Sequence, residues 1–173
     1  MAIPDHGTPA ACRGLEDRKW RKALLAEAHV AFRKEDEGGV VLSLAAIFRD
    51  ETQARRIFAS WTRTMNGKRG RGCFSGSIRE GVTRAGGSSG EPRIAPLGYR
   101  VGERSSGFRM AFVVRAENAS IRGHVSLVLF QQGQAVGFFL SSRAFTPFPR
   151  DDEMRLARLT ARRMQLAQDA LRR

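Results

Sequence analysis

The histidines are the first side chains of this sequence whose type and spacing could support chemistry. His29 stands two residues after Glu27, a spacing that suits a pH-sensitive pair or a general base. His124 stands two residues before Ser126 on the polar side of an alternating segment. Catalysis needs several convergent groups, and the sequence supplies no clear set around either histidine. We therefore interpret both as strand residues that face solvent.

Patterns for a nucleophile or a bound metal are missing from the sequence. It contains no G-x-S-x-G motif, and Ser75-Gly76-Ser77 falls in a predicted strand rather than a strand-to-helix elbow. The acidic run Glu35-Asp36-Glu37 is typical of a turn and would need more oxygen ligands to hold a hard cation. The two cysteines and three histidines lack the spacing of a zinc site. The sequence thus predicts no catalytic residues, no metal and no cofactor.

The charge of the chain is strongly positive, with a net value of +13 and an isoelectric point near 11.4. Twenty-six of the basic residues are arginines, and they are scattered through every segment, often beside Asp or Glu. A protein that grips nucleic acid tends to gather its basic residues on one face or in one tail. The excess of arginine over lysine is therefore more typical of a GC-rich genome than of a binding surface. The charge still attracts phosphates, anionic lipids and acidic polymers at low salt.

The densest basic run is the glycine-rich segment 67–72. Its cations, Lys68, Arg69 and Arg71, are the candidates for binding a polyanion. The run has no interleaved aromatic residue and no P-loop spacing, so we prefer to interpret it as a solvated connector. A polyanion-binding role would predict an affinity that falls steeply with salt, because counterions are released.

The two cysteines, Cys12 and Cys73, are either free core thiols or the two halves of one disulfide. A disulfide would close a loop of about 60 residues and stabilise the fold by about 4 kcal/mol on the chain-entropy estimate. It would also indicate an oxidising compartment. A count of free thiols under denaturing conditions separates the two interpretations.

The start of the sequence does not resemble a signal peptide, because it lacks a basic region followed by an apolar run. Two interpretations stay open: a cytoplasmic protein, or a mature extracytoplasmic domain from which the export signal has been removed. The longest apolar stretch, residues 40–48, is too short to cross a bilayer. We therefore expect no transmembrane segment.

The chain is expected to consist of an N-terminal arm, residues 1–13, and a single α+β domain, residues 14–173. Prolines at positions 4 and 9 prevent regular structure in the arm. The first element of the domain is predicted as a helix over residues 15–28, from a partial apolar stripe.

A hairpin and a helix are predicted next. Alternating apolar residues over 29–48 indicate two strands joined by a charged, glycine-ended turn. Asp50 offers an N-cap with Gln53 as its capping-box partner, so a helix is expected over residues 50–65. It should end at Asn66-Gly67 with a left-handed residue.

The rest of the chain is expected to form strands and a terminal helix. The predicted strands are 73–84, 98–103, 108–115, 122–130 and 135–142, with a flexible loop at 85–92. Acidic residues at the start and arginines at the end of segment 151–172 match a helix dipole. Strands joined by short turns must be antiparallel neighbours. The expected fold class is therefore α+β: an antiparallel sheet of about five to seven strands, with the helix at about 50–65 and the C-terminal helix packed on it.

The predicted sheet has more apolar side chains on its second face than a solvated surface needs. If the helices cover only one face, the other would form an apolar cleft for a lipid-like or other small ligand, or a surface for a protein partner. The candidate cleft residues are Val41, Ile47, Val113, Val128 and Phe139.

Features between about residues 28 and 170 together resemble a known family. They are the strand-then-helix run Val40 to Phe58, Cys73-Phe74 after it, the hairpin Val125 to Leu140 about Gln132-Gly133, the break at Thr146-Pro147-Phe148-Pro149, and Leu156-Ala157 and Arg162-Arg163 in the terminal helix. The pattern resembles actinobacterial extracytoplasmic sensor-like domains. These include the external domain of mycobacterial serine/threonine kinase receptors and related PsbP-like lipoproteins.

The resemblance implies an antiparallel sheet with flanking helices, disulfide-bonded cysteines, a shallow cleft for an unidentified ligand, and no catalysis. The resulting prediction is a non-enzymatic ligand-binding or sensor-like domain, secreted or tethered at the cell surface, whose partner is a small or lipid-like ligand or a protein. The alternative is a cytoplasmic basic protein that binds nucleic acid or other polyanions through its arginine-rich surface.

Overall fold

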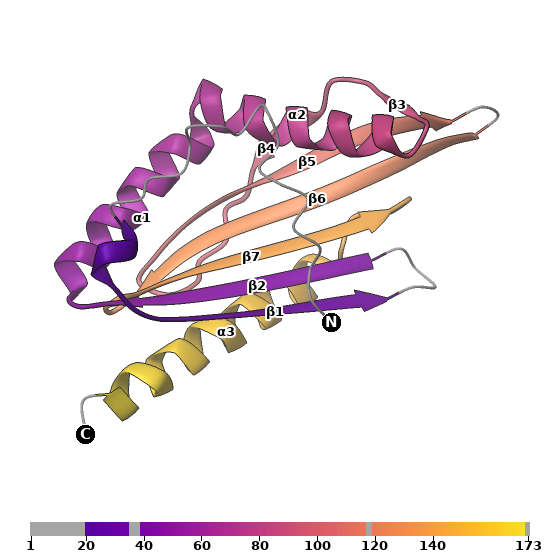
Figure 1. Cartoon of the computed structure of the whole chain (residues 1–173). Coiled ribbons are helices and arrows are strands. Elements are labelled where there is room, and N and C mark those ends of the chain that lie inside the picture. Colours follow the sequence, from indigo (N-terminus) through magenta and orange to yellow (C-terminus); the bar gives the residue numbers. More distant parts are fainter. Residues whose placement is uncertain (1–19, 35–38, 117–118, 172–173) are drawn as a thin grey trace.

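Long antiparallel strands form the centre of the computed structural model, which describes residues 20–34, 39–116 and 119–171 (Figure 1). Two short strands pair with one edge of this set, so that the order across the sheet is β1-β2-β7-β6-β5-β3, with β4 also on β5. All pairings are antiparallel. The strands are β1 (Leu24–Lys34), β2 (Gly39–Phe48), β3 (Ser88–Ser89), β4 (Arg93–Pro96), β5 (Arg104–Ala116), β6 (Ala119–Gln132) and β7 (Ala135–Ala144).

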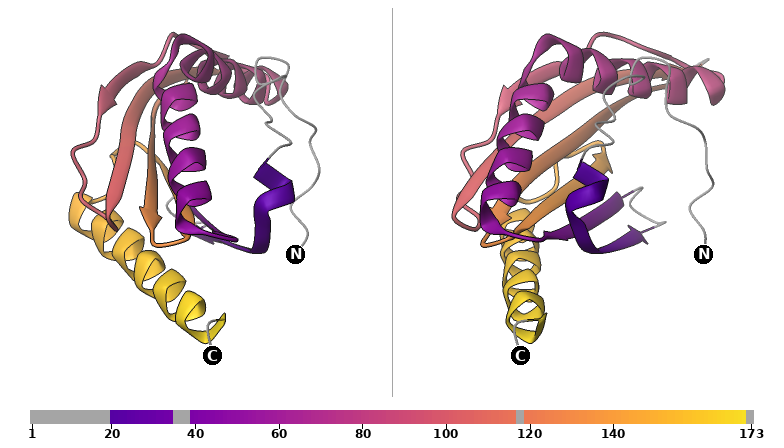
Figure 2. Two further views of the ribbon diagram at one scale, coloured as in Figure 1. Left: turned by 90° about the vertical axis from the view of Figure 1, so that its left-hand side faces the viewer. Right: turned by 60° about the vertical axis from the view of Figure 1, so that its left-hand side comes forward.

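Helices cover both faces of this sheet. Helices α1 (Glu51–Asn66) and α2 (Lys68–Arg84) lie on one face, and α3 (Arg150–Leu171) crosses the other (Figures 1 and 2). Strand alternation divides the core accordingly: Leu129 of β6 packs with the α1 side, and its neighbours Val128 and Phe130 pack against α3. The α+β class, the antiparallel sheet and the packed C-terminal helix are confirmed. Within the described residues, neither face of the sheet lacks a helix, so the condition for the predicted cleft is not met.

The hairpin and the helix after it follow the sequence closely. Strands β1 and β2 form the predicted hairpin, and their antiparallel register places Val30 opposite Ser43. The carboxylate of Asp50 accepts a hydrogen bond from the backbone N–H of Gln53 at 2.7 Å and so caps α1. The predicted left-handed end is wrong, because Gly67 has a φ of −76° and leads directly into a second helix.

Helix α2 replaces the basic connector and the strand predicted over residues 67–84. Phe74 and Ile78 are four residues apart, which places both on one helix face, and they pack against Phe108 and Met110 of β5. Five glycines in and before this segment make it a poor helix former in isolation. Tertiary packing therefore decides the structure here against local propensity.

Other boundaries also differ from the prediction. Of the helix predicted over 15–28, residues 15–19 lie outside the described residues, residues 20–23 form a single 3-10 turn, and β1 begins at Leu24. The predicted strand at 98–103 is irregular, while β4 lies just before it. The loop predicted at 85–92 contains β3. The arm over residues 1–13 is not among the described residues.

Candidate functional site

A groove of about 380 Å³ lies between α3 and the β1–β2 hairpin. Its floor consists of small apolar side chains on alternate strand positions, which leave space that larger residues would fill. Its wall is one face of α3, because residues 160, 163, 164 and 167 recur at helical spacing. The lining residues are Ala26, Glu27, Ala28, His29, Val30, Ser43, Ala45, Ile47, Thr160, Arg163, Met164 and Ala167.

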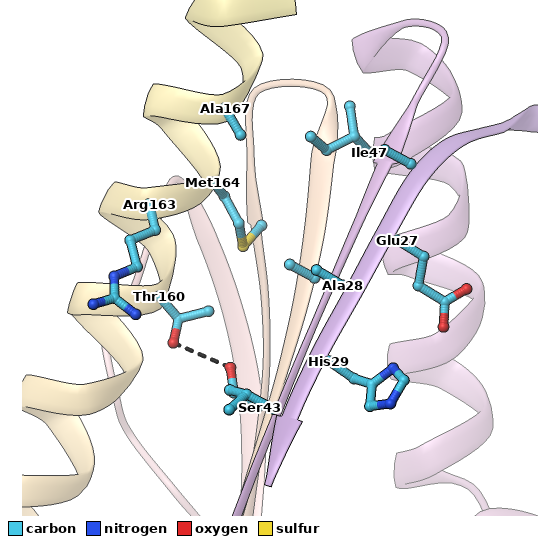
Figure 3. A pocket seen from close by; sticks show the side chains of 12 residues that line it. Glu27, Ala28, His29, Ser43, Ile47, Thr160, Arg163, Met164 and Ala167 are labelled. Carbon is cyan, nitrogen blue, oxygen red and sulfur yellow. Dashed lines mark hydrogen bonds between the residues drawn. The ribbon is translucent and has the colours of Figure 1, made fainter. Parts of the chain in front are cut away.

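The groove has few polar groups, and they lie in different parts of it. The hydroxyls of Ser43 and Thr160 share a hydrogen bond of 3.1 Å across the floor, and Thr160 also donates to the carbonyl of Leu156. Arg163 is exposed and stands at the rim (Figure 3). Glu27 and His29 point away from α3 on the far side of β1, so they contribute backbone to the wall (Figure 3). The groove thus offers an apolar floor, a hydroxyl pair and one accessible cation.

A second cavity, of about 330 Å³, lies on the opposite face between α1, α2 and the sheet. Aromatic and sulfur-containing side chains dominate it, and the edge of Trp20 meets Trp61 beside it at a ring-centre distance of 5.6 Å. The lining residues are Leu44, Ser60, Trp61, Thr64, Met65, Gly70, Cys73, Phe74 and Phe138. Cys73 is disulfide-bonded. Its predicted partner Cys12 lies outside the described residues, so the pairing itself stays a prediction.

A buried carboxylate anchors the first turn of α3. The side chain of Glu153 is 0% exposed. It accepts hydrogen bonds from the Ser141 hydroxyl at 2.6 Å, from the Arg109 guanidinium at 2.7 Å and from the Tyr99 hydroxyl. Arg109 also donates to the Ser126 hydroxyl at 2.9 Å. Because every contact comes from a different element, this network fixes where α3 begins on the sheet.

Burial of the Tyr99 ring, and then the adjacent Glu153 carboxylate, raise the pKa of the Tyr99 hydroxyl well above its usual value. The phenol is therefore held neutral as a hydrogen-bond donor. The Arg150 guanidinium stacks over the same ring at 5.4 Å from its centre. The network shares no residue with the groove lining.

Most of the candidate cleft residues lie in the hydrophobic core. Ile47, Val128 and Phe139 are all buried in the core between the sheet and α3, and of these three only Ile47 also lines the groove. Val41 packs on that core from the side. Val113 lies on β5, away from the groove lining. Of the five candidates, only Ile47 lines the groove, where it stands beside smaller side chains such as Ala28 and Ala45.

The remaining candidates are dispersed. Lys68, Arg69 and Arg71 are exposed in the first turn of α2, which has neither an acidic residue nor a side-chain cap there. Burial, with Arg109 and Arg122 nearby, lowers the pKa of His124. Glu27 and His29 stand on the opposite side of β1 from the groove.

Sequence reasoning missed the alanines of the groove, and it treated Glu153 only as a charge that suits a helix dipole. A usable signal for the groove was the alternation of Ala26, Ala28, Val30 and Phe32, which continues the strand pattern upstream of residue 29. Glu153 gives no such signal, because two further acids precede it.

Among the residues that the structure describes, no three His, Cys, Asp or Glu side chains are placed to hold a metal ion. None of the described helices combines the length and the apolar character of a bilayer span. Comparison with protein-family models and with curated proteins gives no match for this sequence.

Proposed function

We propose that this chain is a non-enzymatic ligand-binding domain whose site is the groove between α3 and the β1–β2 hairpin. The observation that carries the proposal is the groove itself, about 380 Å³ with a floor of alanine, valine and isoleucine side chains. Its volume falls in the range of small-molecule sites, which are largely apolar with a few polar groups that fix orientation. Here the polar groups are the Ser43–Thr160 hydroxyl pair and Arg163.

The ligand that suits this lining is a small amphiphile with an apolar body and an anionic end. Burial of the apolar body against Ala28 and Met164 supplies affinity. A carboxylate, sulfonate or phosphate end can accept hydrogen bonds from the Arg163 guanidinium at the rim. We place the domain outside the cytoplasm as a sensor-like, PsbP-like domain, secreted or tethered to a surface. The disulfide at Cys73 suits an oxidising compartment.

Filling the groove from the α3 side should abolish this binding. We expect Ala167→Trp to weaken saturable binding of an anilinonaphthalene sulfonate dye by about tenfold or more, because an indole occupies space that the dye needs. Leu166→Trp is the matched control, since Leu166 is 60% exposed and lies outside the lining. Fluorescence titration of the folded proteins measures both. Absence of saturable binding by the unmodified chain, or equal losses in the two variants, would contradict the proposal.

A second candidate function, polyanion binding, is favoured by the first turn of α2. Cations at a helix N-terminus oppose the helix dipole, so Lys68, Arg69 and Arg71 are unfavourable there unless an anion is near. This function predicts that single-stranded nucleic acid or heparin binds with an affinity that falls steeply with salt. Replacing the three cations by glutamine should make the slope of log K against log salt shallower, because fewer counterions are released on binding. A slope that stays the same would argue against α2 as the polyanion site.

A further inference from the structure

The two edges of the sheet are built differently. The β5 edge is covered by two short strands, one of four residues ending in Pro96 and one of two residues. Short edge strands and proline hinder pairing with another chain. At the other edge, β1 has 11 residues without a proline and is terminal among the described strands (Figure 1). No described strand pairs with the outer side of β1, so its backbone groups there can pair with a further strand.

The outer strand also exposes apolar side chains. Val30 is 43% exposed and Phe32 is 64% exposed, and both lie on the α3 side of the sheet with Ala28. The opposite side of the same strand carries the charges Glu27 and Arg33. A strand with one apolar and one charged side needs a partner strand that matches both.

A second copy of β1 provides that match in one register. When two copies run antiparallel with Val30 opposite Val30, the residue numbers of each facing pair add up to 60. Glu27 then faces the partner's Arg33, and this ion pair occurs twice because the two-fold axis repeats it. On the other side, Ala28 faces the partner's Phe32, also twice. Moving the register by two residues in either direction breaks the Glu27–Arg33 pairing.

We propose that this chain forms a two-fold symmetric dimer through antiparallel pairing of β1 with β1 of a second copy, in the register centred on Val30. The pairing begins after the register shift between Leu24 and Ala26, which ends the regular edge. It extends the sheet across both copies and removes its long open edge.

The dimer has a consequence for the groove. Ala28 lines the groove, and directly opposite residues in an antiparallel pair have their Cβ atoms about 5 Å apart. The partner's Phe32 therefore stands at the open side of the groove, next to Ala28. Each copy completes the wall of the other's groove, on the side that α3 does not cover.

Charge reversal tests the register. Sedimentation equilibrium on the full oxidised chain, at physiological salt so that repulsion between the copies is screened, should show a monomer–dimer equilibrium. Glu27→Arg and Arg33→Glu should each weaken the dimer by about tenfold or more, because each places like charges opposite one another twice. The double variant should restore it. An equimolar mixture of the two single variants should also restore it, since both arginines of one variant then face glutamates of the other.

Two further variants complete the test. Phe32→Ser should weaken the dimer without affecting the fold, because this ring is exposed, and Glu91→Arg, on an exposed residue away from β1, should leave it unchanged. A monomer at every concentration would overturn the proposal, and so would a dimer that the single reversals do not weaken or that their mixture does not restore. The mass measurement uses no ligand. If the dye does not bind, the proposed function is contradicted but the dimer proposal is not. If the chain is monomeric, the dimer proposal is contradicted but the proposed function is not.

Discussion

Replacing Glu153 by alanine should lower the free energy of unfolding by about 3 kcal/mol, because removal of one member of a buried ion pair leaves the other uncompensated. Arg109, at 26% side-chain exposure, would lose its carboxylate partner, and the hydroxyls of Tyr99 and Ser141 would each lose an acceptor. Urea denaturation followed by tryptophan fluorescence measures the loss.

The neighbouring carboxylate supplies the control. Asp152 pairs with Arg155 at 3.0 Å, but these side chains are 46% and 77% exposed. Exposed pairs contribute little, so Asp152→Ala should cost less than about 1 kcal/mol. An equal loss in the two alanine variants would contradict a structural role for the network.

A double-mutant cycle separates the ion pair from the rest of the network. We expect Arg109→Met combined with Glu153→Met to cost less than the sum of the two single changes, because the double change leaves no unpaired charge. Strict additivity would mean that the 2.7 Å contact between Arg109 and Glu153 contributes nothing of its own.

Much of this fold could be predicted from local patterns. Strict alternation over residues 108–115, and apolar residues at alternate positions in 122–130 and 135–142, predict the strands β5, β6 and β7. Residue types alone predict the capping of α1 by Asp50. These patterns do not tell which face of the sheet each helix covers. Nothing in the sequence says that α3 crosses the face opposite α1, and the cleft prediction failed on that point.

The groove was hidden for a related reason. Much of its floor is made of Ala26, Ala28 and Ala45, which carry no chemical signal of their own. Such a groove exists because small side chains lie next to one another, and the strand register decides which ones do. The β1–β2 pairing places Ala28 opposite Ala45. Glu153 shows the same limit, since only the structure distinguishes it from its two acidic neighbours.

The misassigned helix α2 leads to the other large effect that we expect. A Cβ atom at Gly70 would stand 2.2 Å from the Thr64 carbonyl oxygen and 2.7 Å from the Met65 Cα atom, both in the backbone of α1. Gly70→Ala should therefore force the two helices apart and destabilise the protein by about 2 kcal/mol, even after the gain in helix propensity. Thermal and urea unfolding measure the change.

Gly72, two residues further along α2, is the matched control for this test. A Cβ atom there meets nothing within 4 Å, so Gly72→Ala should stabilise the protein by up to about 1 kcal/mol through helix propensity alone. If residues 67–72 formed the connector and residues 73–84 the strand that the sequence predicts, alanine at Gly70 would meet no helix backbone and would not carry this cost. Opposite signs for the two alanines thus report both that α2 is a helix and that its first turn packs directly on α1. Equal effects at Gly70 and Gly72 would refute that packing.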